Sequence, residues 1–262
     1  MATGKDRLDK LLVGRQLAPT RQKAQALIGA GLVRVNGELV DKAGTLVPAD
    51  SAIELTGDAC PFVSRGGLKL EAGLAAFDIE PQGWICADVG ASTGGFTDCL
   101  LQHGAARVYA IDVGYGQLAW RLRQDPRVVV MERTNARHLQ PGDLPEPLDL
   151  AVVDASFISL KLLIPPLLPF FRERVSILAL IKPQFEAGKG KVGKGGVVRD
   201  PDLHRQVTAE IVEFAASLSL ESRGVVPSPI LGPKGNKEFL IHLVALGTKP
   251  SRSQDLSNTF PR

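Results

Sequence analysis

Apolar residues in the second half of the chain occur in short runs with helical patterns between them. Short apolar runs bounded by turn residues are typical of parallel strands that are buried on both faces of a sheet. Such runs are present at residues 85–89, 108–111, 128–131, 150–153 and 177–181. Apolar positions with helical spacing lie at residues 96–103, 117–124, 160–170 and 203–218. With a last alternating strand at 238–244, this order predicts an α/β domain built on an open, doubly wound sheet.

The N-terminal part of the chain has a different pattern. The leucines of residues 8–12 share one face of a short helix, and Thr20 is placed to cap a second helix. Asn36-Gly37 follows an alternating segment and is a strong signal for a two-residue hairpin turn. Residues 53–55 are expected to close the small sheet. This part of the chain is therefore predicted to be a small α+β module.

These patterns predict two domains. Residues 1–59 form the small module and residues 60–64 form a linker. Residues 65–247 form the sheet domain, which begins with a helix at residues 66–77. Residues 248–262 are polar, contain Ser and Pro, and are predicted to be a frayed tail.

A glycine-rich turn connects the first buried run to the helix that follows it. The turn reads Asp88-Val89-Gly90-Ala91-Ser92-Thr93-Gly94-Gly95-Phe96, and its glycines allow the backbone to approach a ligand closely. Its spacing is neither GxGxxG nor the phosphate-binding loop that ends in Gly-Lys. Asp112 ends the next run, 22 residues after Gly90, and is placed to accept hydrogen bonds from ribose hydroxyls. The combination favours S-adenosylmethionine; a dinucleotide or a tight turn without a ligand are the alternatives.

The net charge of the whole chain is ordinary, but one region has a local excess of basic residues. The 262 residues include 31 Lys and Arg against 28 Asp and Glu, a net charge of +3, and 44% are hydrophobic. These ordinary values exclude a disordered tail protein and a highly basic chromatin-type protein. The first 34 residues, however, contain seven basic and two acidic side chains. A local basic patch of this kind is typical of contact with nucleic-acid phosphates.

Two further features limit the function classes. No apolar run approaches the roughly 20 residues that span a bilayer, and the start of the chain has no apolar signal region. We therefore expect no membrane role and a cytoplasmic location. Cys60, Cys86 and Cys99 form neither a CxxC pair nor an even set, so reduced thiols are expected, with no disulfide framework and no metal site.

A second basic segment lies between residues 182 and 199. Lys189, Lys191 and Lys194 alternate there with glycines. One interpretation is a loop beside the active site that becomes ordered on RNA. The alternative is a linker without function.

Several motifs, in order along the chain, resemble known protein families. Residues 7–12, 20–28 and 31–37 resemble the S4 RNA-binding fold, and the C-terminal part resembles the FtsJ/RrmJ-like ribose methyltransferases, which have a Rossmann-like sheet. From Lys5 to Leu246 the chain resembles the TlyA ("hemolysin A") family of ribosomal RNA 2′-O-methyltransferases. The motifs that support this resemblance lie at residues 63–70, 88–97, 112–120, 154–160, 182–186, 195–198 and 232–238.

The resemblance implies S-adenosylmethionine-dependent methylation of ribosomal RNA, at a cytidine ribose of 16S or 23S RNA or both. The implied catalytic residues are Lys69, Asp154, Lys182 and Glu238. The cofactor-binding residues are expected to be Asp88, Gly90, Ala91, Ser92, Thr93, Gly94, Gly95, Phe96, Asp112 and Asp154. The RNA-binding residues are expected to be Lys5, Arg7, Arg21, Lys23, Arg65, Lys189 and Lys191.

The chemistry of these residue types agrees with the implied roles. A ribose hydroxyl is a weak acid that must lose its proton as it attacks a methyl carbon. A lysine can take that proton only if its pKa lies well below about 10.4. Asp154 and Lys182 are expected at the carboxyl ends of parallel strands, where open sheets bind ligands. By resemblance, Lys182 is the base, Asp154 orients it, and Lys69 and Glu238 complete the network.

Each of these residues also has a structural alternative. Asp154 could cap the helix that follows, and Lys182 could be the solvated end of a strand. Lys69 could lie on the surface of its helix, and Glu238 could pair there with a neighbouring lysine. For the whole chain, the alternatives are a catalytically silent RNA-binding protein of the same fold and a membrane-lytic protein, which the lack of an export signal disfavours. The target nucleotide, the ribosomal subunit and the oligomeric state stay open.

Overall fold

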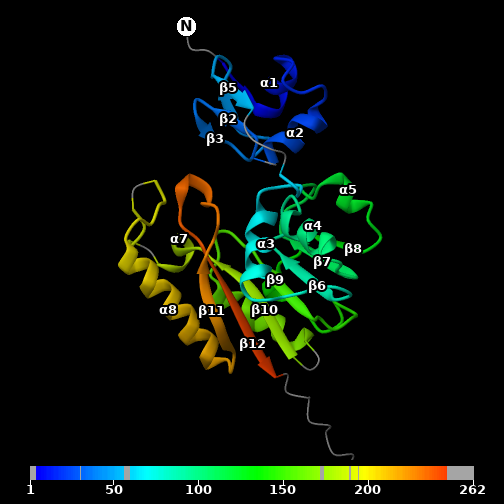
Figure 1. Cartoon of the computed structure of the whole chain (residues 1–262), viewed down its shortest axis with the longest axis vertical. Coiled ribbons are helices and arrows are strands. Elements are labelled where there is room, and N and C mark those ends of the chain that lie inside the picture. Colours follow the sequence, from blue (N-terminus) through cyan, green and yellow to red (C-terminus); the bar gives the residue numbers. More distant parts are fainter. Residues whose placement is uncertain are drawn as a thin grey trace, which may run out of the picture.

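The protein consists of a small N-terminal domain placed above a larger sheet domain (Figure 1). The computed structural model describes residues 4–29, 31–55, 60–171, 174–188, 190–193 and 195–246. The predicted tail at 248–262 lies outside these residues.

The small domain combines two helices with two small sheets. Its helices are α1 (Leu8–Gly14) and α2 (Arg21–Gly29). One sheet has the order β3-β2-β5, formed by Glu38–Leu39, Val33–Val35 and Ile53–Leu55. The other pairs β1 (Lys5–Arg7) with β4 (Leu46–Pro48). The two helices, the hairpin and the closing strand confirm the predicted module, whereas the β1–β4 pair was not foreseen.

Local chemistry explains these elements. The Thr20 hydroxyl accepts a hydrogen bond from the backbone N–H of Lys23 at 3.1 Å, which caps α2. Asn36 and Gly37 have φ values of 51° and 80°, as a tight hairpin between right-twisted strands requires. The buried core of the domain includes Leu8, Leu12, Ala24, Ile28 and Val33.

The large domain is built on a seven-stranded sheet of order β11-β12-β10-β9-β6-β7-β8. The parallel strands are β6 (Ile85–Val89), β7 (Arg107–Asp112), β8 (Val128–Glu132), β9 (Leu150–Val153) and β10 (Arg174–Ile181). The last strands, β11 (Glu221–Pro227) and β12 (Phe239–Leu246), are antiparallel to each other, and β12 is antiparallel to β10. The predicted doubly wound sheet is confirmed, with β11 as an addition that the sequence did not indicate.

Alternate side chains of each strand enter two separate cores, one on each face of the sheet. Cys86, Val108 and Leu150 face one core, together with side chains of α3 (Gly66–Ala76) and α4 (Gly95–Gln102). The neighbouring strand residues face the other core, which α6 (Ile164–Leu167) and α8 (Pro201–Ser217) cover. Burial on both faces explains why these strands are continuous apolar runs.

Two predicted helices differ from expectation. Residues 160–170 form η2 (Leu160–Leu162), α6 and η3 (Leu168–Phe170) in place of one helix, because prolines at 165, 166 and 169 remove backbone donors. The helix expected at 117–124 is only α5 (Trp120–Arg123). The remaining short helices are η1 (Ala136–His138), α7 (Pro183–Glu186) and η4 (Pro233–Gly235).

The order of the strands determines where a ligand can bind. The chain proceeds from β6 toward β7 and β8 on one side and later returns to β9 and β10 on the other. A crevice forms where such a sheet reverses direction, outside the carboxyl ends of the strands. This point lies between β6 and β9, and it brings the glycine-rich turn next to Asp154.

The small domain contacts the large one close to this crevice. The backbone N–H of Arg65 donates to the Gly29 carbonyl at 3.2 Å, and the Arg65 guanidinium forms a 3.0 Å ion pair with Asp41. Gly31 has a φ of 71°, and a Cβ there would overlap the Arg65 side chain. The junction therefore requires glycine at this position.

Candidate active site

The glycine-rich turn packs directly against the loop that follows β9. Gly90 has a φ of 88°, and a Cβ on it would lie 2.7 Å from the backbone oxygen of Asp154. Both the conformation and the close approach require glycine here. Gly94, with a φ of 94°, then begins α4. The turn therefore brings its backbone to the edge of the crevice.

Asp88 stabilises this turn from behind. Its side chain is fully buried, and one carboxylate oxygen accepts hydrogen bonds from the Thr97 backbone N–H at 2.8 Å and the Thr97 hydroxyl at 2.6 Å. Burial raises the pKa of Asp88 to about 7, although the Thr97 donors oppose the change. Asp88 and Gly94 were predicted to bind the cofactor, but neither lines the cavities described below. The structure places both where they shape the loop.

A cavity of about 660 Å³ lies beside the turn, a size suited to a cofactor. Gly90, Ser92, Asp112 and Asp154, four of the residues predicted to bind the cofactor, line it. Asp112 accepts hydrogen bonds from the backbone N–H groups of Ser92 at 2.8 Å and Gly114 at 2.6 Å. Its carboxylate therefore stands between the two loops that border the cavity.

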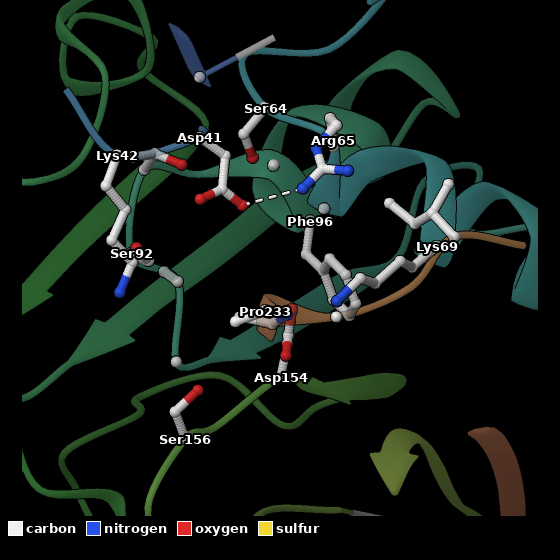
Figure 2. A pocket seen from close by; sticks show the side chains of 18 of the residues that line it. Asp41, Lys42, Ser64, Arg65, Lys69, Ser92, Phe96, Asp154, Ser156 and Pro233 are labelled. Carbon is white, nitrogen blue, oxygen red and sulfur yellow. Dashed lines mark hydrogen bonds and ion pairs between the residues drawn. The ribbon is translucent and has the colours of Figure 1, made fainter. Parts of the chain in front are cut away.

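A second, smaller cavity of about 200 Å³ is lined by three of the four predicted catalytic residues, Lys69, Asp154 and Lys182; Figure 2 labels Lys69 and Asp154. Ala91, Thr93, Gly95 and Phe96 of the turn also line it. Lys69 points into it from α3 and forms a 2.6 Å ion pair with Glu238. Lys182 lies 2.5 Å from Asp154. The two cavities share Gly90, Ser92, Asp154 and Ser156 as lining residues, so the larger and the smaller cavity meet at the end of β9.

Burial and charge act against each other in this cluster. Burial favours the neutral acid, but the charges of Lys182 and Lys69 hold the pKa of Asp154 below its usual range. Asp154 is therefore a carboxylate beside a lysine. Glu238 is 1% exposed, and its Oε1 has no hydrogen-bond partner among the described residues.

These contacts exclude the structural alternatives for the four residues. Lys69 and Lys182 are 7% and 6% exposed, so neither is a surface lysine. Glu238 pairs with Lys69 inside the domain, directly before β12. Ser159 caps η2 by accepting a hydrogen bond from the Lys161 N–H at 3.1 Å, so Asp154 is not the cap.

The predicted RNA-binding residues fall into separate groups. Arg7 and Arg21 meet at the buried Asp9 carboxylate, with ion pairs of 2.9 and 2.8 Å. Lys5, Lys23 and Lys191 are exposed. Arg65 is bound to Asp41 at the domain junction. Lys189 lies outside the described residues.

Part of the glycine-rich basic segment is attached to the loop before β12. Lys234 Nζ donates to the Gly195 carbonyl at 3.0 Å, and the Asn236 side chain donates to the Gly196 carbonyl at the same distance. Asn236 also accepts a hydrogen bond from the Val198 N–H at 3.0 Å. This end of the segment is therefore held in place by hydrogen bonds to the loop before β12.

The sequence analysis missed several cavity residues. Lys42 of the small domain lines both cavities, and Asn135 and Ala136 line the larger one. Phe157 is 87% exposed with a φ of 66°, and its ring centroid lies 5.0 Å from that of Phe185. A positive φ on an aromatic residue is uncommon. No periodicity signals these positions, because loops and domain packing place them.

Comparison with known proteins identifies the two domains. A profile of FtsJ-like methyltransferases matches residues 62–245, and an S4 domain profile matches residues 6–53. The chain belongs to the FtsJ-like methyltransferase family. It is 50% identical to the "16S/23S rRNA (cytidine-2'-O)-methyltransferase TlyA" of Mycobacterium tuberculosis over 238 residues, which cover 90% of this chain and 89% of that protein.

Other relatives support this family membership. A protein named "Hemolysin A" from Brachyspira hyodysenteriae is 39% identical over 91% of this chain and 99% of its own length. A solved structure from Streptococcus thermophilus, provisionally named a hemolysin, is 43% identical, with a TM-score of 0.74 over 95% of this chain and 91% of that chain. In this FtsJ-like methyltransferase, none of the described helices is long and apolar enough to cross a membrane.

Proposed function

We propose that this protein is an S-adenosylmethionine-dependent 2′-O-methyltransferase of ribosomal RNA, with cytidine as its target. The observation that carries the proposal is the presence of two ion pairs, Lys69–Glu238 and Lys182–Asp154, at the smaller cavity, whose wall at Asp154 is shared with the larger one. The activity printed for the relative from Mycobacterium tuberculosis supports the substrate. A ribosomal substrate also supports a cytoplasmic location.

The residues of the larger cavity fit S-adenosylmethionine. Gly90 and Ser92 bring the backbone of the turn to the wall of this cavity, and Asp112 offers carboxylate oxygens to ribose hydroxyls. When bound, this cofactor supplies an electrophilic methyl group on a positively charged sulfur. The shared wall at Asp154 supports a placement of that methyl group beside the catalytic cavity.

Lys182 is the group best placed to take the proton of the ribose hydroxyl. Its amine faces the smaller cavity and bonds to the ionised Asp154. Asp154 orients the amine, and Lys69 adds positive charge on the same side. Glu238 fixes Lys69 in turn. A positioned general base contributes about 100- to 10,000-fold to a rate.

The S4 domain supports recognition of folded RNA. Arg7 and Arg21 are half exposed while Asp9 holds them, and Lys42 reaches the mouth of the catalytic cavity. Phosphate contacts of this kind position a substrate without reading its bases. Ribosomal subunits are the proposed partners.

The proposal is tested by replacing Lys182 with Ala and measuring methyl transfer to ribosomal subunits. We expect the rate to fall about 100-fold or more, with cofactor affinity by calorimetry unchanged. Lys237→Ala is the control, because Lys237 is exposed and directly precedes Glu238. A Lys182→Ala rate close to that of the control would exclude Lys182 as the base. Absence of transfer by the unmodified protein would favour the silent RNA-binding alternative.

A further inference from the structure

Ser156 lies in the loop after β9, two residues beyond Asp154, and belongs to no assigned catalytic set. Its side chain lines both cavities and is exposed to them (Figure 2). The Ser156 hydroxyl accepts a hydrogen bond from Lys182 Nζ at 3.0 Å. Within the described part of the chain, Asp154 and Ser156 are the two groups that bond to this amine.

The importance of this arrangement follows from the number of hydrogens on the Lys182 amine. A lysine that acts as a base is neutral, with two N–H bonds and one lone pair. Asp154 is ionised and can only accept a hydrogen bond. If both N–H bonds are directed to Asp154 and Ser156, the lone pair takes the one remaining tetrahedral direction around Nζ.

We propose that Ser156 is a positioning residue that directs the lone pair of Lys182 toward the ribose hydroxyl. This inference rests on the proposed function and deepens it. Lys182 accepts the proton of the 2′-hydroxyl as that oxygen bonds to the methyl carbon. The electron pair of the broken carbon–sulfur bond stays on sulfur, which becomes neutral.

Asp154 alone does not fix the amine. With one N–H bond held, rotation about the Cε–Nζ bond lets the lone pair occupy either of the two other positions. The surrounding charged groups, Lys69, Glu238 and the buried Asp88, supply no further bond to Nζ in the described structure. Misorientation of a reacting group can cost about 100-fold in rate.

The test compares Ser156→Ala with Ser156→Thr, which retains a hydroxyl. Single-turnover methyl transfer to ribosomal subunits is expected to fall by about 10- to 100-fold in Ser156→Ala and to recover in Ser156→Thr. The KM for subunits, the cofactor dissociation constant by calorimetry and the melting temperature should stay close to those of the unmodified protein. Ser217→Ala is the control, because Ser217 is exposed on α8 and lines neither cavity.

Three results would overturn the inference. They are an unchanged rate in Ser156→Ala, a loss confined to KM or cofactor affinity, and failure of Ser156→Thr to restore the rate although it binds cofactor normally. Lys182→Ala is measured in parallel. If Lys182→Ala is inactive and Ser156→Ala is fully active, only the positioning role is wrong; if Lys182→Ala is active, the proposed base is wrong as well.

Discussion

At the scale of single residues, the two lysines of the site are held differently. Lys69 pairs with a glutamate that is sealed inside the domain, whereas Lys182 bonds to an aspartate and a serine that both line open cavities. Glu238 lines neither cavity, whereas Asp154 lines both cavities and Lys182 lines the smaller one. This difference supports Lys182, rather than Lys69, as the proposed base.

The closed pair gives a prediction about stability. Lys69→Met leaves Glu238 buried without its partner, so the free energy of unfolding should fall by about 3–5 kcal/mol. Adding Glu238→Met removes the stranded charge and should restore most of this loss in chemical denaturation, while methyl transfer stays abolished. A double variant as unstable as Lys69→Met would show that the ion pair is not the cause.

Asp88 gives a prediction about pH. Its pKa is about 7 in the folded protein against an ordinary 3.8. Between these pH values the unfolded chain loses the proton while the folded protein keeps it, so the free energy of unfolding falls as the pH rises. Three pH units correspond to roughly 4 kcal/mol, and the part between pH 5 and pH 8 is roughly 2–3 kcal/mol.

The Asp88→Asn variant has no titratable carboxyl group at this position, so its free energy of unfolding should not show this decrease with rising pH. We expect its stability relative to the unmodified protein to increase from pH 5 to pH 8 in denaturant titrations. Asp149→Asn is the control, because Asp149 is an exposed carboxylate that bonds to the other end of β6. A stability difference for Asp88→Asn that is the same at both pH values would contradict the account.

At the scale of elements, burial decides what the sequence could predict. The first and last residues of β6 and β9 were predicted correctly, because strands that are buried on both faces consist of continuous apolar residues. The edge strand β11 was missed, since it contains polar residues and a register shift near Gly224. The candidate catalytic residues were predicted from family resemblance. No sequence pattern predicted that Asn135 and Lys42 line a cavity, because packing between segments distant in sequence brings them there.

The helices of the S4 domain give a prediction about RNA binding. Asp9 of α1 holds Arg7, Arg21 and Gln25 together, so Arg7 at the end of β1 and Arg21 at the start of α2 are anchored at one carboxylate. Arg21→Gln should weaken binding to ribosomal RNA and lower the slope of log affinity against log salt by about one, without a change in melting temperature. Arg34→Gln removes the same charge from the β2–β3 hairpin and is the control; equal slopes in the two variants would refute an Arg21 phosphate contact.

At the scale of the whole molecule, the domain junction connects RNA binding to the reaction. Asp41 and Gly31 fix Arg65, and the adjacent Lys42 then lines both cavities. The S4 domain therefore lies over the crevice at the carboxyl ends of the strands (Figure 1). We expect RNA bound to the S4 domain to lie beside the smaller cavity, which Lys42 and Lys182 both line.

The identity of the methylated product distinguishes ribose methylation from other activities. Ribosomal subunits are incubated with the protein and methyl-labelled S-adenosylmethionine, and the RNA is digested to nucleosides and separated by mass. The account predicts label in 2′-O-methylcytidine, and none with Lys182→Ala. Label on a base or in a ribosomal protein, or equal label with Lys182→Ala, would contradict it.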